Sequence, residues 1–191
     1  MPTGTSRAGR PKATSRATIA EAACELFLEQ GYENTSVVDI VRRAGVSRSS
    51  FFNYFDSKAA ILWAGLDARI ADLPEALEGD RSNVRGALRN LAEDFAPDSL
   101  ALAIANSEAM GLDEELEREA AVRAARIGRA VAQRLRGDGA ADLVAAVAGA
   151  AHGGAVLAAI EAWAHAGAGR IALPAELDAA LDAAAPTLPH C

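Results

Sequence analysis

Two glycines divide the first 60 residues into helical segments that are each too short to fold alone. Apolar residues at 19, 22, 23, 26 and 27 follow helical spacing and lead to Gly31. Thr35 or Ser36 then suits the N-cap of a second helix, which ends before Gly45. Glycine is favoured just after a helix because it adopts the left-handed conformation without a steric penalty. The sequence therefore predicts a small cluster of short helices that pack on one another.

A third helix is predicted to begin after Ser47 and to run to about Phe55. It carries four of the nine aromatic residues of the chain within residues 51–55. Phe51 and Phe55 are four residues apart, so both lie on one helix face and can fill the small core. Asp56 or Ser57 is then expected to cap a fourth helix, which runs to near Pro74.

Composition favours helices in the rest of the chain as well. Hydrophobic residues make up 51% of the 191 residues, most of them Ala and Leu, while strand-favouring residues are sparse. Further helices are expected over residues 82–95, 97–110, 114–136, 140–166 and 175–185. No apolar run reaches about 18 residues without a charged or polar break, which argues against a membrane span. With Cys24 and Cys191 lacking disulfide or metal spacing, a reducing cytoplasm is the expected location.

Charge is distributed unevenly along the chain. Residues 1–62 hold eight Lys/Arg and six Asp/Glu, whereas the remainder holds eleven and twenty, out of totals of 19 and 26. Residues 1–13, which are rich in Gly, Pro, Thr and Arg, are expected to form a flexible basic arm. This asymmetry indicates that the N-terminal part faces an anion, although the whole chain has a net charge of −7.

The segments on either side of Ala44-Gly45-Val46 have the spacing of a helix-turn-helix motif. In this motif two short helices meet at a steep angle, and the second lies in the major groove of DNA. Hydrogen-bonding side chains are left facing outward on the third helix: Arg48, Ser49, Ser50, Asn53 and Tyr54. Arg can bridge two acceptors of guanine and Asn can pair with adenine, so this set predicts contacts with bases. Phe52 is left open between a core position and an apolar contact to a thymine methyl.

The run TIAEAACELFLEQGYENTSVVDIVRRAGVSRSSFFNYFDSKAAIL resembles the N-terminal domain of the tetracycline-repressor (TetR) family of bacterial regulators. The resemblance covers residues 16–62 and rests on the segments LFLEQGYENTSV, DIVRRAGVS and YFDSK. It implies an all-α fold of about nine helices, with a DNA-binding domain at 14–60 and a helical ligand-binding and dimerisation domain at 61–191. The family form of the third helix is Leu-Tyr-x-Tyr-Phe, so Phe52 here lacks a hydroxyl that often touches DNA.

The resemblance also implies DNA-contacting roles for individual residues. Tyr54 and Lys58 would contact phosphates, and Thr35 and Ser36 would touch the DNA backbone at the start of the second helix. The base-reading set would be Arg48, Ser49, Ser50 and Asn53. The arm would follow the backbone or enter a minor groove through its basic residues, Arg7, Arg10, Lys12 and Arg16.

Dimerisation is expected through the last two long helices, as the resemblance implies. These are the segments from Asp142 to Trp163 and from Glu176 to Leu188, where Gly149, Gly153 and Gly154 permit close helix approach. An intramolecular core helix is the alternative for the first segment. Candidate pocket residues are large or apolar, and each also suits plain core: Trp63, Leu66, Phe95, Leu102, Met110, Ile127, Val131, His152 and Trp163. His152 stays open between pocket, core and interface.

These observations predict a ligand-responsive homodimeric repressor that binds a pseudo-palindromic double-stranded DNA operator and is released by a small, largely apolar effector. The FFNYFDSK and ILW segments resemble a subgroup that senses acyl-CoA-type ligands. The alternatives are an activator or a non-sensing DNA binder of the same fold, and then a helical enzyme or carrier. No Ser/His/Asp set, carboxylate pair, phosphate-binding glycine loop or metal-ligand spacing is present in the sequence. No enzyme activity, cofactor or metal is therefore predicted.

Overall fold

The computed structural model describes residues 12–79, 83–95, 98–167 and 170–185 of the chain, and in these ranges it is all-α. Ten helices are present there, one more than the resemblance implies, because the predicted helix at 97–110 is divided at Asn106. Their bounds are α1 Lys12–Gln30, α2 Val37–Ala44, α3 Arg48–Phe52, α4 Lys58–Glu78, α5 Val84–Ala92, α6 Ser99–Ala105, α7 Ser107–Met110, α8 Asp113–Gly137, α9 Asp142–His165 and α10 Leu173–Ala184.

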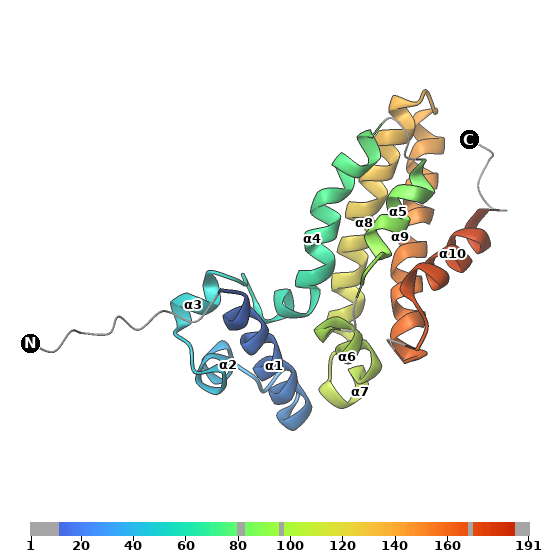
Figure 1. The fold of residues 1–191 in the computed structure, drawn as a ribbon. Coiled ribbons are helices and arrows are strands. Elements are labelled where there is room, and N and C mark those ends of the chain that lie inside the picture. The colour runs from blue at the N-terminus through green and yellow to red at the C-terminus, as the bar shows by residue number, and fades with distance from the viewer. Residues whose placement is uncertain (1–11, 80–82, 96–97, 168–169, 186–191) are drawn as a thin grey trace, which may run out of the picture.

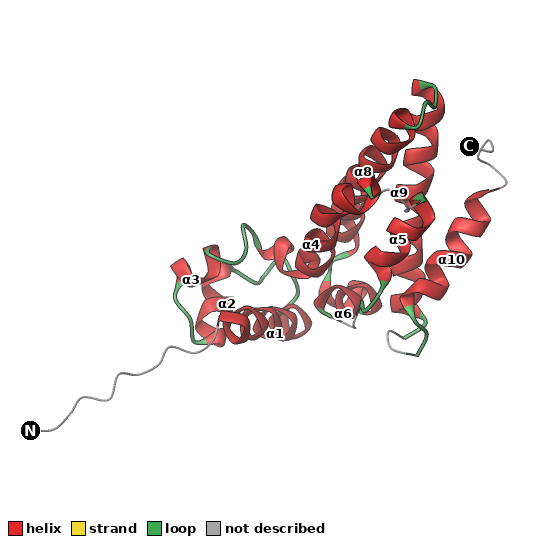
Figure 2. Cartoon of the chain, turned by 45° about the horizontal axis from the view of Figure 1, so that its top comes forward, coloured by secondary structure: helices red, strands yellow, loops and turns green. Residues whose placement is uncertain are grey.

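The helices form a small N-terminal unit and a larger helical body. Helices α1, α2 and α3 lie together at one end, and α4 leads from them into the larger body (Figure 1). There α4, α8 and α9 lie along one another, α5 and α10 pack at one side, and α6 and α7 lie between this body and α1 (Figures 1 and 2). Because α4 begins at Lys58, it belongs to both units.

Several helix boundaries differ from the sequence expectations. Helix α1 begins at Lys12, so the last two residues of the expected arm are helical, while residues 1–11 lie outside the described residues. Helix α3 is shorter than predicted and ends at Phe52. Helix α4 continues past Pro74 for one turn, since Leu73 and Leu77 are buried and their packing offsets the hydrogen bond that proline removes.

Helices α8 and α9 approach each other closely because glycines face each other at their contact. A Cβ atom added at Gly149 would overlap the carbonyl oxygen of Gly128, and one at Gly153 would overlap that of Ala124. Gly154 points to open space on the other side of α9. Two of the three glycines assigned to close helix approach therefore serve a contact within the chain.

One helix of the described residues, α9, is long and apolar enough to cross a membrane by length and composition alone. His152 and Glu161 interrupt this helix, so it does not contradict the expectation that no apolar run of about 18 residues lacks a charged or polar break. Its buried residues, Ala145, Val156 and Trp163 among them, pack against α8, α10 and α6.

Candidate nucleic-acid interface and ligand pocket

Helix α2 is held by a complete set of local caps. The hydroxyl of Ser36 accepts a hydrogen bond from the backbone N–H of Asp39, whose carboxylate accepts one from the N–H of Ser36. At the other end Gly45 is left-handed, with φ of 66°, and the N–H of Val46 donates to the carbonyl of Val41. This turn sets the angle at which the chain enters α3.

Helix α3 presents its polar residues next to buried aromatic rings. Ser47 caps it by accepting a hydrogen bond from the N–H of Ser50. Phe51 and Phe55 are buried with ring centres 5.8 Å apart. The side chains of Arg48, Ser49 and Asn53 are exposed, and those of Ser50 and Tyr54 are half-buried. The structure thus brings together five of the eight predicted DNA-contacting residues on or next to α3.

Phe52 lies on the surface, which excludes the core position, one of the two alternatives that the sequence left open. Its side chain is 46% exposed and its ring meets that of Phe51 edge-on at 5.2 Å. The guanidinium of Arg48 lies over the same ring, 5.6 Å from its centre. A cation above an aromatic face is held electrostatically, so Phe52 limits the directions in which Arg48 can extend.

The serine hydroxyls of α3 are hydrogen-bonded to one another. The Oγ atom of Ser47 lies 2.9 Å from that of Ser49 and 2.9 Å from that of Ser50. A hydroxyl both donates and accepts, so each serine keeps capacity for a further bond. Contacts of Ser49 and Ser50 with DNA are compatible with this cluster.

Thr35 is placed differently from the expectation that it touches DNA. Its side chain is buried, at 1% exposure, and its hydroxyl donates to the carbonyl of Gly31 over 2.8 Å. Neighbouring Ser36 is exposed, although its hydroxyl is used by the cap of α2. Thr35 therefore closes the α1–α2 loop and presents no side chain to a ligand, whereas Ser36 keeps an exposed edge.

Lys58 also has internal partners. Its ammonium donates to the carbonyl oxygens of Tyr32 and Thr35 over 2.6 Å and 3.3 Å, and it lies 3.8 Å from the centre of the Tyr32 ring. Two of its three N–H groups are thus occupied within the protein. Lys58 joins the first turn of α4 to the α1–α2 loop.

The basic residues assigned to the arm are only partly within the described residues. Arg7 and Arg10 lie outside them, and the side chain of Lys12 does as well. Arg16 belongs to α1, and its guanidinium lies 5.6 Å from the ring centre of Phe55. The side chain of Arg16 is exposed beside this ring.

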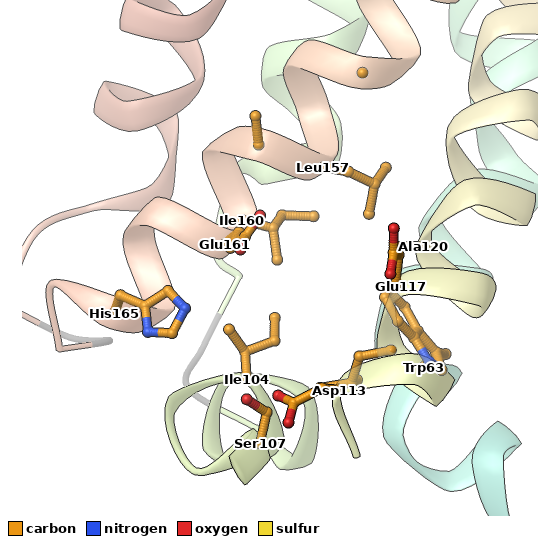
Figure 3. Close-up of a pocket in the computed structure, with 13 residues that line it drawn as sticks. Trp63, Ile104, Ser107, Asp113, Glu117, Ala120, Leu157, Ile160, Glu161 and His165 are labelled. Carbon is orange, nitrogen blue, oxygen red and sulfur yellow. The ribbon is translucent and has the colours of Figure 1, made fainter. Parts of the chain in front are cut away.

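A pocket of about 560 Å³ opens in the larger body, between α4, α6, α7, α8 and α9 (Figure 3). Its lining combines apolar side chains with carboxylates, one hydroxyl and one imidazole: Trp63, Ile104, Ser107, Asp113, Leu116, Glu117, Ala120, Gly154, Leu157, Ala158, Ile160, Glu161 and His165. Among the described residues, no group of three or more His, Cys, Asp or Glu is arranged to hold a metal ion.

Of the nine predicted pocket residues, only Trp63 lines this pocket. Six others form core: Leu66, Phe95, Met110, Ile127, Val131 and Trp163. Phe95 and Trp163, for example, pack edge-on with ring centres 5.6 Å apart. Leu102 is 40% exposed, and the Nδ1 atom of His152 lies 2.7 Å from the carbonyl oxygen of Ala148, one turn earlier on α9. The prediction was based on large apolar character, and that character is equally typical of core residues.

Sequence reasoning missed the polar lining. Asp113 and Glu117 are exposed in the first turns of α8, and both line the pocket. Glu161 and His165, four residues apart on α9, line it from the other side. The spacing of 113 and 117 by one helical turn is a signal for a shared face. Which face is turned inward depends on the packing of α8.

Tyr32 connects the pocket elements to the N-terminal unit. Its backbone N–H donates to the carbonyl of Met110 in α7 over 2.7 Å, and its hydroxyl lies 3.4 Å from Glu115 in α8. Burial, followed by the nearby charge of Glu115, raises the pKa of Tyr32, so its hydroxyl stays protonated. A shift of α7 or α8 would therefore be felt directly at the α1–α2 loop.

The exposed face of α9 carries large apolar side chains. Leu143 is 76% exposed and Val147 is 52% exposed, and both are on the same helical face as Gly154 and Ala158. In α10, by contrast, Leu173, Leu177 and Leu181 are buried within the chain. The last residues of the expected interface, 186–188, lie outside the described residues.

Together, α2, its glycine turn and α3 form a helix-turn-helix motif whose exposed surface is mostly polar. The family described as bacterial regulatory proteins, tetR family, matches residues 19–64, which span most of α1, all of α2 and α3, and the first two turns of α4. The resemblance seen in the sequence is thereby confirmed.

Named relatives match parts of the chain. The Mycobacterium tuberculosis protein MftR, named for transcriptional regulation of mycofactocin biosynthesis, is 40% identical over 86 residues, 44% of this chain and 43% of that protein. The transcriptional repressor DhaR of a Mycobacterium species is 36% identical over 59 residues, 31% of this chain and 30% of that protein. The chain thus spans less than half the length of these relatives.

Solved structures share the fold over the whole chain. The dihydroxyacetone kinase operon activator DhaS superposes with a TM-score of 0.55 at 16% identity, covering 91% of this chain and 96% of that one. This likeness extends the all-α architecture to the larger helical body, which the family match does not reach.

Proposed function

We propose that this chain is a DNA-binding transcriptional regulator, acting in the bacterial cytoplasm as a ligand-responsive homodimeric repressor rather than as an enzyme. The observation that carries the proposal is the surface of α3, where Arg48, Ser49 and Asn53 are exposed above the buried rings of Phe51 and Phe55. Exposed Arg and Asn side chains on a short helix suit the acceptor pattern of the major groove.

Within this proposal, Arg48, Ser49, Ser50 and Asn53 read bases, while Tyr54 and Ser36 contact the DNA backbone. Thr35 and Lys58 support the site from within, because their polar groups bond to the α1–α2 loop. The DNA-binding unit comprises α1, α2, α3 and the first turn of α4, and the remainder of the chain binds effector and forms the dimer.

The dimer is proposed to form through the exposed face of α9, where Leu143 and Val147 stand among small residues. An apolar helix face of this kind favours close packing with a second copy. Two α3 helices would then enter successive major grooves, which requires a pseudo-palindromic operator.

Release by an effector is supported by the contacts of Tyr32. The pocket lining includes α7 and α8, and the same two helices contact Tyr32 through Met110 and Glu115. An effector that binds better to one arrangement of α7 and α8 would shift the population of α3 arrangements in the dimer.

Selection of bound sequences from random double-stranded DNA tests the proposal. The full chain should enrich a site with two inverted half-sites, and transcription from a promoter that carries this site should fall when the protein is added. Failure to enrich any sequence at low salt would contradict the DNA-binding role. A rise in transcription would replace repression by activation, the role for which DhaS is named.

A further inference from the structure

The pocket described above has an unusual balance of charge. Three carboxylates line it, those of Asp113, Glu117 and Glu161, and its lining contains no Lys or Arg. Among the described residues, none of the three forms an ion pair. All three residues are exposed, and carboxylates without cationic partners favour the approach of a positive charge.

The rest of the lining is apolar and aromatic. Ile104, Leu157 and Ile160 form walls between the carboxylates, together with the indole of Trp63 (Figure 3). A cavity of about 560 Å³ has the size of pockets that enclose a drug-sized molecule. An occupant therefore needs an apolar body as well as charge.

Trp63 adds an aromatic ring to the pocket lining. Its side chain is 2% exposed, and within the described residues its indole N–H has no hydrogen-bond acceptor. The guanidinium of Arg123 lies 4.4 Å from the ring centre, but it carries only donors and cannot accept a hydrogen bond from that N–H. A buried donor without a partner is uncommon in folded proteins, and this one is shielded from solvent.

We propose that the effector of this regulator is a lipophilic organic cation, with its charge near Glu117 and Glu161 and its apolar body against Ile104, Leu157 and Trp63. The inference rests on the proposed function and names the ligand class of the same pocket. An acyl-CoA-type effector carries several phosphate charges, which these carboxylates would repel.

The position of the pocket explains how such a cation would be enclosed. Gly154, Ala158 and Glu161 line it from the exposed face of α9, the face that also carries Leu143 and Val147. A second copy docked on this face would lie over the mouth of the pocket. Binding of the cation in the pocket would then be coupled to the arrangement of the two copies in the dimer.

Two ions of the same shape and opposite charge test the proposal. Tetraphenylphosphonium and tetraphenylborate are titrated into the full-length protein by calorimetry, with lauroyl-CoA as a third ligand. We expect the phosphonium to bind at least about tenfold more tightly than the borate, and lauroyl-CoA to bind more weakly than the phosphonium. Equal or reversed preference would overturn the proposal, as would the absence of phosphonium binding.

Variants on two different helices locate the binding site. Glu117→Gln on α8 and Glu161→Gln on α9 should each weaken phosphonium binding by roughly two- to fivefold, the range expected for a partly exposed charge pair. Glu75→Gln, which removes an exposed carboxylate of α4 outside the pocket lining, serves as the control and should leave binding unchanged. If all three variants weaken binding equally, the ion responds to net charge and the proposal fails.

DNA binding is measured separately, so the two failures can be told apart. Phosphonium binding at the pocket without any enriched operator would leave the ligand class standing and remove the regulatory role. An enriched operator without phosphonium binding would do the reverse. When both are present, we expect saturating phosphonium to release the operator from the wild-type protein and from Glu75→Gln at equal concentrations.

Discussion

The ammonium of Lys58 lies 2.6 Å from the carbonyl oxygen of Tyr32 and 3.8 Å from the centre of the tyrosine ring. Tyr32 in turn bonds through its backbone N–H to Met110. One lysine at the start of α4 therefore fastens the loop through which the N-terminal unit contacts the pocket helices. The same residue was expected from the family resemblance to bind a phosphate, and the two roles make different predictions.

Lys58→Ala is expected to lower the free energy of unfolding by about 1–3 kcal/mol, because the carbonyls of Tyr32 and Thr35 lose a charged donor. The salt dependence of DNA binding should stay unchanged, since the ammonium is occupied within the protein. Chemical denaturation and binding measured over a range of salt concentrations check both parts. If the slope of log binding constant against log salt concentration falls in magnitude by roughly 1 while stability is unchanged, Lys58 contacts a DNA phosphate.

Asn53→Ala tests base reading without disturbing the fold. The side chain of Asn53 is exposed at the end of α3, so the stability of the variant should stay within about 0.5 kcal/mol of wild type. Binding to the selected operator should weaken by about 1–3 kcal/mol, and binding to random DNA by much less. Asn90→Ala, at an exposed site on α5, is the matched control. Equal losses on both DNAs would make Asn53 a backbone contact.

Local features of the fold could be predicted from the sequence because they depend on residues a few positions apart. Ser36, Ser47 and Ser57 are the N-caps of three helices, and Gly45 has the left-handed conformation expected after α2. Each of these outcomes follows from the bonding of one side chain to its own turn, or from the missing Cβ of glycine.

The pocket could not be predicted in the same way, since it depends on which side of each helix is covered by its neighbours. Met110 and Ile127 are fully buried, although their apolar character suits a pocket equally well. Arg123 is buried against Trp63 within a charged segment whose sequence favours exposure, because Asp67 and Glu119 supply partners from α4 and α8. The pairing of Arg123 with Asp67 joins residues 56 positions apart and leaves no short-range signal.

Adjacent glycines of α9 provide a matched pair for the α8–α9 contact. Gly153→Ala should destabilise the protein by about 1–3 kcal/mol, because the new Cβ would meet the backbone of Ala124 and force the helices apart. Gly154→Ala meets open space within the chain and should gain up to about 1 kcal/mol from helix propensity. Thermal unfolding of both variants checks this difference in sign. If both substitutions change stability equally, close approach of α8 and α9 at Gly153 does not contribute to stability.

The exposed apolar face of α9 can be tested by adding charge. In Leu143→Glu/Val147→Glu, two copies would have to bury four carboxylates, so the dimer dissociation constant should rise by about 100-fold or more. Val122→Glu, at a half-exposed valine of α8, controls for the added charge and should leave the dimer intact. Sedimentation equilibrium measures both. A dimer that survives the double substitution would place the interface elsewhere.

The last prediction concerns Asp98, which caps α6 from a half-buried position. Its carboxylate accepts hydrogen bonds from the N–H groups of Leu100 and Ala101, yet burial, the largest influence, raises the pKa of Asp98. A carboxyl group whose pKa is higher in the folded state than in the unfolded state binds its proton more tightly when folded. The ionised group therefore costs stability at neutral pH, and this cost disappears as the pH falls through the raised pKa to below the unfolded value of about 3.9.

Asp98→Asn keeps an acceptor for the cap and removes the charge, so it should be more stable than wild type at pH 7. This advantage should shrink steadily as the pH is lowered and vanish near pH 3. Asp98→Ala loses the cap as well and should be about 1 kcal/mol less stable than Asp98→Asn at every pH. Urea denaturation of the three proteins from pH 3 to pH 8 measures both differences. A difference in stability between wild type and Asp98→Asn that does not change with pH would show that the carboxyl group titrates normally despite its burial, and that its effect on stability comes from the cap alone.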